Sequence, residues 1–467
     1  MAYTELFRRL AAEGAMIERL SSDSRRAARG TAFLAYPGEG ADGRAYIGDA
    51  LGRGASAVLW EEEGFAWRGE WRVPNAPVRG LKQAAGSIAH EFYGRPSDSL
   101  WMCGVTGTNG KTSCSQWVSA LLNRHGVPSR VIGTLGAGAP GAFQPVGNTT
   151  PDALELHRLL KEFVSQKAQA VAMEVSSHGL VQGRVNGVAF DCALFTNLTQ
   201  DHLDYHGSMQ AYGEAKARLF ETPGLAAAVL NLDDAFGALL AQRLAARMRV
   251  IGYGLAATPA ARVDDYLSPG ALRGVQTGQL GEFNVSNALG VLGCLLAYGL
   301  ELREAAPLLD SLPAVPGRME SVADEPLVVV DYAHTPDAIE KVLTALRPVA
   351  EKRGGRLTIV FGAGGERDAA KRPLMGAVAR RLADRALATS DNPRGEDPLK
   401  IIAQIGLPEA EPDRARAIER AIREAGRSDV VLIAGKGHES YQEIGGRRLP
   451  FSDAAVARAA VAKRRPA

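Results

Sequence analysis

The segment CGVTGTNGKTS, residues 103–113, decides the fold. An apolar run, LWMCGV, leads into it, and a helix-like stretch from Thr112 to about Arg124 follows it. A strand, a glycine-rich loop and a helix in that order are typical of a P-loop, whose backbone N–H groups surround phosphate. The usual spacing would place a glycine at position 105, where this chain has Val105. The segment therefore predicts a phosphate-binding loop with a shifted glycine pattern.

The shifted loop keeps the groups that phosphate binding needs. Gly107 and Gly110 let N–H groups converge on phosphate oxygens. Lys111 can reach the terminal phosphates, and Thr112 can offer a hydroxyl to Mg²⁺ at a helix N-terminus. A plain glycine-rich turn with an exposed lysine is the alternative, which the flanking strand and helix disfavour. We predict an ATP site made by Gly107, Thr108, Asn109, Gly110, Lys111, Thr112 and Ser113.

Strand-like segments on both sides of the loop divide the chain into three zones. The first zone ends at YGRPSDS, whose Pro, Ser and Asp are typical of a boundary, and the third begins near Pro313–Pro316. Helical patterns alternate with the strands, and the tail after Ser452 reads as a final amphipathic helix. Strands are predicted at 31–36, 55–60, 100–105, 168–175, 190–198, 226–232, 326–332, 356–363, 385–390 and 429–435.

This alternation predicts an α/β protein of three domains, and a length of 467 residues also suggests roughly three. The domains are expected at 1–97, 98–314 and 315–467. The central domain should contain a P-loop ATPase-like parallel sheet, and the C-terminal domain should be a Rossmann-like doubly wound sheet.

Composition narrows the class of protein. Hydrophobic residues make up 46% and charged residues 23%, as in a soluble globular protein, and a net charge of +2 argues against a nucleic-acid partner. The four cysteines form no CxxC pair, which favours reduced thiols in a cytoplasm. The N-terminus has no continuous apolar run of the signal-peptide kind, and the run at 290–300 is too short to span a bilayer. We expect a cytoplasmic protein, without membrane insertion, that is a monomer.

Acidic and histidine side chains follow two of the predicted strands. Glu174 ends one of them, and burying a carboxylate there without a partner is costly, so a cation or a structural ion pair is expected. The segment TNLTQDHLDYHG, residues 196–207, holds two acids and two histidines. It suits a metal or phosphate site, or a helix cap with surface histidines, but it has no zinc spacing.

Six segments in order resemble the Mur ligases of bacterial cell-wall synthesis: TGTNGKTS, EVSSHGL, TNLTQDHLDYHG, FNVSNALG, DYAHTPDA and GKGHE. With SSDSR at 21–25, the resemblance extends from Ser22 to Glu439, which is nearly the whole chain. It implies three domains that bind, in order, the UDP part of the substrate, ATP and the incoming amino acid. It also implies ADP-forming amide ligation, in which the carboxylate of UDP-MurNAc-L-Ala-D-Glu becomes an acyl phosphate that an amine then displaces.

The resemblance assigns roles to individual residues. Two anions must meet in this reaction, so Lys111 and Mg²⁺ would lower their repulsion. Thr112 and Glu174 would hold one Mg²⁺, and His202 would help to hold a second. Lys216 matches a family lysine that is carbamylated and that would also serve as a metal ligand. The catalytic residues implied are Lys111, Glu174, His202 and Lys216. The nucleotide would also contact Asn284, Asn287, Arg318, Asp331 and His334. The UDP-MurNAc-dipeptide would contact Ser22, Ser24, Thr149, Thr150, Ser176, Arg184 and Lys216. Without the resemblance, Lys216 would be interpreted as a solvated helical lysine and Asn284 as a helix cap.

The run SDNPRGE at 390–396 indicates which amino acid is added, because DNPR resembles the signature of family members that use meso-diaminopimelate. Diaminopimelate differs from lysine by a second carboxylate, which the guanidinium fork of Arg394 can bind bidentately. With lysine as substrate, Arg394 would be left unpaired, and Glu439 could pair with the distal ammonium. The expected contacts are Arg367, Asp391, Asn392, Pro393, Arg394, Gly435 and Glu439.

Four other functions are compatible with parts of the sequence. The same ligase could add L-lysine, and a folylpolyglutamate synthetase would share the loop and the acyl-phosphate chemistry. A P-loop kinase or nucleotide-binding regulator would explain the loop alone, and an idle scaffold would need none of the catalytic residues. The segment 255–282 is short compared with the family, which we expect to trim peripheral strands and to leave the catalytic segments unchanged.

Overall fold

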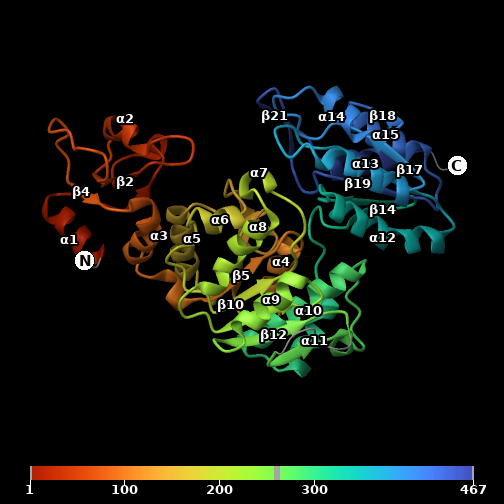
Figure 1. Ribbon diagram of the computed structural model, residues 1–467, viewed down its shortest axis with the longest axis horizontal. Coiled ribbons are helices and arrows are strands. Elements are labelled where there is room, and N and C mark those ends of the chain that lie inside the picture. Colours follow the sequence, from red (N-terminus) through yellow and green to blue (C-terminus); the bar gives the residue numbers. More distant parts are fainter. Residues whose placement is uncertain (1–2, 257–262, 465–467) are drawn as a thin grey trace.

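The computed structural model describes residues 3–256 and 263–464. Its strands form three large sheets and one hairpin, and the sheets contain strands within residues 19–78, 101–267 and 320–434. We call the parts built on these sheets the first, central and third bodies. In Figure 1 the first body (red to orange) and the third body (blue) lie at opposite ends, with the central body between them. The proposed domain limits at 97/98 and 314/315 stay a prediction.

The first body is a parallel sheet of four strands in the order β1-β2-β3-β4. Its central strands are apolar runs that are buried on both faces, because helices and loops cover each side. The strands are β1 (Arg19–Ser21), β2 (Thr31–Ala35), β3 (Ala57–Glu61) and β4 (Asn75–Val78), and the helices are α1 (Tyr3–Ala12), α2 (Ile47–Gly52) and α3 (Leu81–Phe92).

The central body holds nine strands in the order β13-β12-β11-β10-β5-β9-β6-β7-β8. All pairs are parallel except β6–β7 and β7–β8, which form an antiparallel edge. The strands are β5 (Trp101–Thr106), β6 (Ser129–Gly133), β7 (Gly136–Ala139), β8 (Ala142–Gln144), β9 (Ala170–Glu174), β10 (Cys192–Phe195), β11 (Ala227–Asn231), β12 (Arg249–Tyr253) and β13 (Asp265–Leu267). The helices are α4 (Lys111–Arg124), α5 (Ala153–Ser165), α6 (Ser177–Val181), α7 (Leu203–His206), α8 (Met209–Ala217), α9 (Ala235–Leu244), α10 (Glu282–Tyr298) and α11 (Leu302–Leu308).

The third body is a doubly wound sheet of six strands in the order β14-β15-β19-β16-β17-β18, in which only β14 is antiparallel. A hairpin, β20–β21, follows its last sheet strand. The strands are β14 (Glu320–Asp324), β15 (Leu327–Asp331), β16 (Leu357–Phe361), β17 (Arg385–Ala388), β18 (Glu409–Ala410), β19 (Val430–Ala434), β20 (Tyr441–Ile444) and β21 (Arg447–Pro450). The helices are α12 (Pro336–Arg353), α13 (Lys371–Leu382), α14 (Pro398–Ile405), α15 (Arg414–Glu424) and α16 (Asp453–Ala462).

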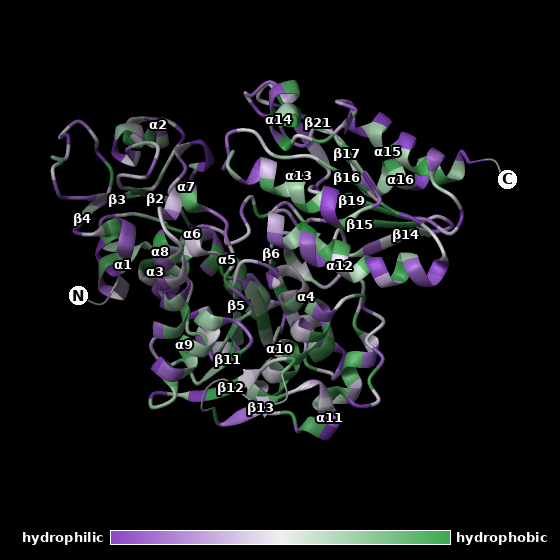
Figure 2. Ribbon diagram, turned by 45° about the vertical axis from the view of Figure 1, so that its right-hand side comes forward, coloured by the Kyte–Doolittle hydropathy of each residue, from purple (hydrophilic) through white to green (hydrophobic). Residues whose placement is uncertain are grey.

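Apolar strands and amphipathic helices build the cores of the central and third bodies. In Figure 2 the strands of these sheets are mostly green, whereas helices such as α12 and α15 alternate between purple and green. Separate clusters of buried apolar side chains lie on the two faces of each sheet. The α/β class with parallel sheets, all ten predicted strands and the final helix are confirmed.

The short segment 255–282 contributes only the three-residue edge strand β13 and a 3-10 turn, and its residues 257–262 lie outside the described part of the chain. None of the described helices is both long and apolar enough to cross a membrane.

Candidate active site where the central and third bodies meet

The P-loop connects β5 to α4 and needs both of its inner glycines. Gly107 and Gly110 adopt φ values of +140° and +87°, which L side chains rarely adopt. A Cβ at Gly107 would collide with the hydroxyl of Thr196, and one at Gly110 would lie 2.6 Å from Oδ1 of Asn287. The shifted glycine pattern is therefore what this loop requires, since the close approaches occur at 107 and 110.

Residues that follow β10 hold the loop from the side. The backbone N–H of Asn109 donates to Oδ1 of Asn197 at 3.0 Å, and the hydroxyl of Thr196 donates to the Asn109 carbonyl at 2.6 Å. The hydroxyl of Thr108 donates to the Thr199 carbonyl at 3.1 Å. The sequence offered one signal for these partners, the polar run TNLT directly after an apolar strand.

Two lysines converge on the loop. Nζ of Lys111 donates to the carbonyls of Gly107 at 2.9 Å and Thr108 at 2.8 Å, and Nζ of Lys216 donates to the Gly107 carbonyl at 2.9 Å. Burial lowers the pKa of both ammonium groups, and the charge of Lys111 lowers that of Lys216 further. Lys216 is 1% exposed, so it is not the solvated helical lysine that its sequence alone would indicate.

Thr112 and Glu174 form an oxygen-rich corner beside the loop. The hydroxyl of Thr112 donates to Oε2 of Glu174 at 3.0 Å, while Thr134 donates to the same carboxylate through its N–H at 2.8 Å and its hydroxyl at 3.1 Å. Glu174 is 1% exposed. A hydroxyl and a carboxylate are the hard oxygen ligands that Mg²⁺ takes, so these residues fit that ion.

His202 and His334 approach one buried carboxylate from different bodies. Oδ2 of Asp201 lies 3.5 Å from Nε2 of His202 and 3.8 Å from Nε2 of His334, and Oδ1 lies 3.9 Å from Nζ of Lys371. Burial lowers the pKa of His202 to about 3, which leaves a neutral imidazole able to bind a metal. Asp201, one of the two acids of the segment 196–207, and Lys371, which sequence reasoning missed, thus join the central body to the third.

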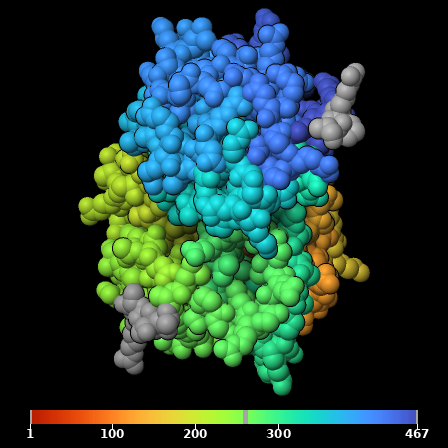
Figure 3. Space-filling model, turned by 90° about the vertical axis from the view of Figure 1, so that its right-hand side faces the viewer, coloured from red at the N-terminus to blue at the C-terminus, as the bar shows by residue number. Residues whose placement is uncertain are grey.

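A cavity of about 790 Å³ lies where these two bodies meet. Figure 3 views this join from the side, with the third body (blue) above the central body (green). Its lining includes Asn109, Gly110 and Ser113 of the loop together with Asn284, Asn287, Arg318 and Asp331. The structure therefore brings these predicted nucleotide contacts together, whereas His334 lies beside Asp201 instead.

The nucleotide-side residues are held in place by local contacts. Nη2 of Arg318 donates to the Thr112 hydroxyl at 2.9 Å, and its guanidinium lies 4.3 Å from the ring centre of Tyr332. The carboxylate of Asp331 accepts the N–H groups of Met319 and Ala333, and burial raises its pKa. Asn284 donates to the Leu280 carbonyl at 2.8 Å.

Several residues expected to hold the muramoyl peptide lie close to the backbone of Glu174. The hydroxyl of Thr150 donates to the Glu174 carbonyl at 3.0 Å and lies 3.1 Å from that of Ser176, and Nη1 of Arg184 donates to the Thr150 carbonyl at 2.9 Å. The hydroxyl of Thr149 lies 3.0 Å from that of Thr134.

The two serines expected on the UDP side differ in their surroundings. Ser22 lines a second cavity of about 280 Å³ between the first and central bodies, whose lining includes Arg19 and Arg26 of the first body and Arg158 of α5. Ser24 is buried, and its hydroxyl donates to Asp49 at 2.7 Å.

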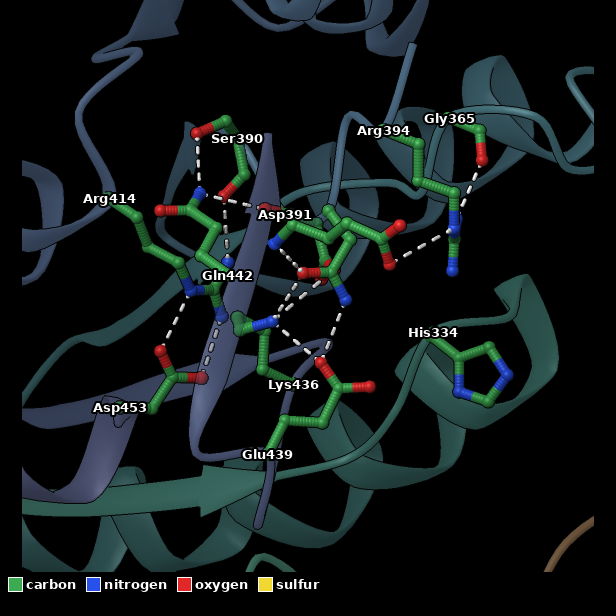
Figure 4. A network of polar contacts seen from close by, with 12 residues as sticks. His334, Gly365, Ser390, Asp391, Arg394, Arg414, Lys436, Glu439, Gln442 and Asp453 are labelled. Atoms are coloured by element: carbon green, nitrogen blue, oxygen red, sulfur yellow. Dashed lines mark hydrogen bonds and ion pairs between the residues drawn. The ribbon is translucent and has the colours of Figure 1, made fainter. Parts of the chain in front are cut away.

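The loops after β17 and β19 bring most of the predicted amino-acid contacts together (Figure 4). Asp391, Asn392 and Pro393 are buried, and Nδ2 of Asn392 donates to Oε2 of Glu439 at 2.8 Å. A Cβ on Gly435 would lie 2.5 Å from Oδ2 of Asp391, so the two loops touch. Arg367 is exposed on the loop between β16 and α13.

Arg394 has protein partners, which revises one expectation. Its Nη1 donates to the Gly365 carbonyl at 2.6 Å, and its Nε lies 4.0 Å from Oε2 of Glu443. A substrate without the second carboxylate would therefore not leave this guanidinium wholly unpaired. The penalty against lysine should accordingly be smaller than the sequence suggests.

Lys436 is a residue of this region to which sequence reasoning gave no role. It lies inside the GKGHE run, its side chain is 0% exposed, and its Nζ donates to Glu439 at 2.6 Å and to Asn392 at 2.9 Å. Glu439, which we expected to pair with the distal ammonium of the substrate, is thus already paired with Lys436.

Comparison with known protein families gives matches along most of the chain. Residues 16–93 match the Mur ligase family catalytic domain, residues 105–295 match the Mur ligase middle domain, and residues 317–437 match the Mur ligase glutamate ligase domain.

Two curated relatives and two solved structures define the likeness further. UDP-N-acetylmuramoyl-L-alanyl-D-glutamate–2,6-diaminopimelate ligases of Janthinobacterium sp. and Chromobacterium violaceum are each 49% identical, over 95% and 96% of this chain and 94% and 95% of their own. A solved ligase of the same name is 36% identical with a TM-score of 0.65, over 96% of this chain and 95% of that one. A bifunctional folylpolyglutamate synthase/dihydrofolate synthase, 21% identical with a TM-score of 0.61 over 76% of this chain and 91% of its own, shares the fold alone.

Proposed function

The chain belongs to the Mur ligase family, and we propose that it joins meso-2,6-diaminopimelate to the D-Glu of UDP-MurNAc-L-Ala-D-Glu while ATP becomes ADP and phosphate. The observation that carries this proposal is that Thr112 meets Glu174 beside the P-loop, and Asn392 of DNPR meets Glu439, in a chain 49% identical to diaminopimelate ligases. The reaction supplies precursor for peptidoglycan, and we place it in the cytoplasm. We expect the domain 1–97 to bind UDP-MurNAc, 98–314 to bind ATP and 315–467 to bind the amino acid.

The P-loop side would activate the D-Glu carboxylate. The ammonium of Lys111 now donates to the Gly107 and Thr108 carbonyls. When phosphate binds, Lys111 would donate to phosphate oxygens in place of these carbonyls, and so it can balance charge on the γ-phosphoryl group during transfer. Thr112 and Glu174 would hold Mg²⁺, with His202 on a second ion. When bound, Mg²⁺ supplies the positive charge that lets two anions approach. The carboxylate oxygen then bonds to the γ-phosphorus and ADP leaves.

Lys216 would act as a carbamate. Burial and the charge of Lys111 lower the pKa of Lys216, which raises the share of free amine, and only the free amine adds to CO₂, forming an N–C bond and releasing one proton. A carbamate presents oxygens, which an ammonium does not, and it would also balance the positive charge of Lys111. Arg184 and Thr150 lie at the acceptor side, where a guanidinium can hold the substrate carboxylate.

The third body would deliver the amine. Arg394 would bind the distal carboxylate of diaminopimelate and Glu439 its distal ammonium, which leaves the other amine to attack the acyl phosphate. Nitrogen bonds to the carbonyl carbon, a tetrahedral intermediate forms, and phosphate departs with the loss of one proton from the amine. Asn284, Asn287, Arg318 and Asp331 line the cavity expected to hold the adenosine part of ATP.

Phosphate release tests the proposal directly. The protein is incubated with ATP, Mg²⁺ and UDP-MurNAc-L-Ala-D-Glu, and meso-diaminopimelate, L-lysine, L-glutamate or no amino acid is added. We expect release that requires the UDP substrate and is stimulated most by diaminopimelate. Equal stimulation by lysine would refute the specificity, and release that is independent of the UDP substrate would refute the function.

A further inference from the structure

A buried ammonium connects two loops of the proposed amino-acid site, and Gln442 and Glu443 of β20 add further hydrogen bonds to one of these loops. The two loops follow β17 and β19, and β16 lies between those strands in the sheet, so these two strands do not pair with each other. Nζ of Lys436, in the loop after β19, donates to Oδ1 of Asn392 in the loop after β17 at 2.9 Å. It also donates to Oε2 of Glu439 at 2.6 Å and lies 4.0 Å from Oδ1 of Asp391.

The backbone turns Lys436 inward between two glycines. Gly435 and Gly437 have φ values of +115° and +54°. A Cβ on Gly435 would lie 2.5 Å from Oδ2 of Asp391, and one on Gly437 would lie 2.7 Å from the Gly317 carbonyl. These close approaches favour glycine on both sides of the lysine. Its side chain is 0% exposed, so the ammonium depends on its protein partners rather than on water.

The partners of Lys436 are the residues that would meet the substrate. Oε2 of Glu439 accepts from both Lys436 and Nδ2 of Asn392, at 2.6 Å and 2.8 Å. Among residues 3–256 and 263–464, Oε1 of Glu439 has no hydrogen-bond partner, and in Figure 4 this oxygen points away from Lys436. One oxygen is thus fixed by the protein, while the other is available to a ligand.

We propose that Lys436 is a positioning residue of the amino-acid site, which fixes Glu439 so that its free carboxylate oxygen receives the distal ammonium of diaminopimelate. This inference rests on the proposed function. Lys436 does not touch the substrate. It acts by orienting the Glu439 carboxylate, and by offsetting the repulsion between the Glu439 and Asp391 carboxylates.

Two analogues separate this role from general support of the fold. 2-Aminopimelate keeps both carboxylates but lacks the distal ammonium, whereas L-lysine keeps the ammonium but lacks the distal carboxylate. If Lys436 acts through Glu439, its loss should weaken only those substrates that carry a distal ammonium. A purely structural role would weaken all three substrates equally.

The experiment measures kcat/KM for the three substrates in the full-length wild type, Lys436→Met and Lys436→Gln, with exposed Lys400→Met as the matched control. In Lys436→Met we expect the preference for diaminopimelate over 2-aminopimelate to fall about 10–100-fold, the range for losing a hydrogen bond to a charged group. The preference for diaminopimelate over lysine and the KM for ATP should stay unchanged. Lys436→Gln keeps a donor of similar length and provides the same measurement if Lys436→Met does not fold.

A double-variant cycle completes the test. Glu439→Gln should remove the same preference, and adding Lys436→Met to it should cause no further fall, because both changes act on one contact. An unchanged preference in both Lys436 variants, or an equal fall for all three substrates, would overturn the inference. Wild-type protein that releases no phosphate with diaminopimelate would instead refute the proposed function.

Discussion

Lys111 and Lys216 donate to the same atom, the carbonyl oxygen of Gly107, each at 2.9 Å. Two ammonium groups that share one neutral acceptor repel each other, and this repulsion contributes to the lowered pKa of Lys216. An incoming polyphosphate or a carbamate on Lys216 would relieve it. The pair of lysines thus makes the loop attractive to anions before any ligand binds.

Replacing Lys111 by Met should remove the charge that phosphoryl transfer needs. We expect the rate of phosphate release to fall about 100–1000-fold, as on loss of one preorganised stabilising donor. Lys111→Arg should not restore it, because a planar guanidinium cannot replace a compact ammonium under the loop. Binding of diaminopimelate, measured by calorimetry, serves as the control, and a rate within tenfold of wild type would contradict the assignment.

Replacing Lys216 by Ala should abolish ligation if the carbamate is required. We expect a fall of at least about 100-fold, and partial recovery on adding a short-chain carboxylic acid that can place a carboxylate in the vacated space. Activity of the wild type should also decline in CO₂-depleted buffer and return with bicarbonate. Exposed Lys161→Ala is the control. If bicarbonate and carboxylic acids have no effect on either protein, the carbamate is wrong.

Arg394→Ala should raise the KM for diaminopimelate, while the KM for ATP stays near the wild-type value. A bidentate contact to a charged group is worth about 1.5–3 kcal/mol, which corresponds to roughly 10–100-fold in KM. The variant should also lose most of its preference for diaminopimelate over lysine. Steady-state kinetics with each amino acid checks this, and an unchanged KM for diaminopimelate would remove Arg394 from the site.

His157 should make the protein sensitive to acid. It is fully buried on α5, its Nε2 lies 3.0 Å from the Asn186 carbonyl, and burial lowers its pKa to about 4. The unfolded chain, with an ordinary histidine pKa of about 6.5, binds the proton more readily between these two values. The contribution of neutral His157 to the free energy of unfolding is therefore fully present above about pH 6.5. It is lost as the pH falls toward 4, by about 3 kcal/mol in total.

His157→Gln tests this, because glutamine stays neutral and can still donate to Asn186. Urea unfolding between pH 4 and 7 should show a weaker loss of stability on acidification in the variant than in the wild type. Exposed His125→Gln is the matched control and should follow the wild type. An identical pH dependence in His157→Gln and wild type would contradict the prediction.

The longer apolar strands and the P-loop could be predicted from sequence because both are local patterns. Runs such as LVVVD predicted β15, and the glycines at 107 and 110 predicted the loop. The remaining strands were not predicted: β1, β4, β6, β7, β8, β12, β13, β14, β18, β20 and β21. None of them has more than five residues, and their pairing with neighbouring strands, more than an apolar run, defines them.

The individual site residues followed from motif resemblance, but their partners did not. Asp201 contacts Lys371, which lies 170 positions further along the sequence. Lys436 follows β19 and contacts Asn392, which follows β17, although β16 lies between these two strands. The first pair depends on how the central and third bodies are placed, and the second on the strand order of one sheet, neither of which a local pattern encodes. For the same reason the sequence could not show that Gly365 and Glu443 already surround Arg394.

The cavity between the central and third bodies also has a thermal consequence. Its lining runs from Asn109 to Pro348, so neither sheet alone makes a complete pocket. A ligand that binds only the assembled pocket adds RT ln(1 + [L]/Kd) to the free energy of unfolding, and this gain disappears when either body melts. Without nucleotide, we expect the two bodies to melt in separate steps. With nucleotide in the cavity, the two bodies should melt in a single cooperative transition. ATP would then stabilise the contact between the two bodies as well as act as a reactant.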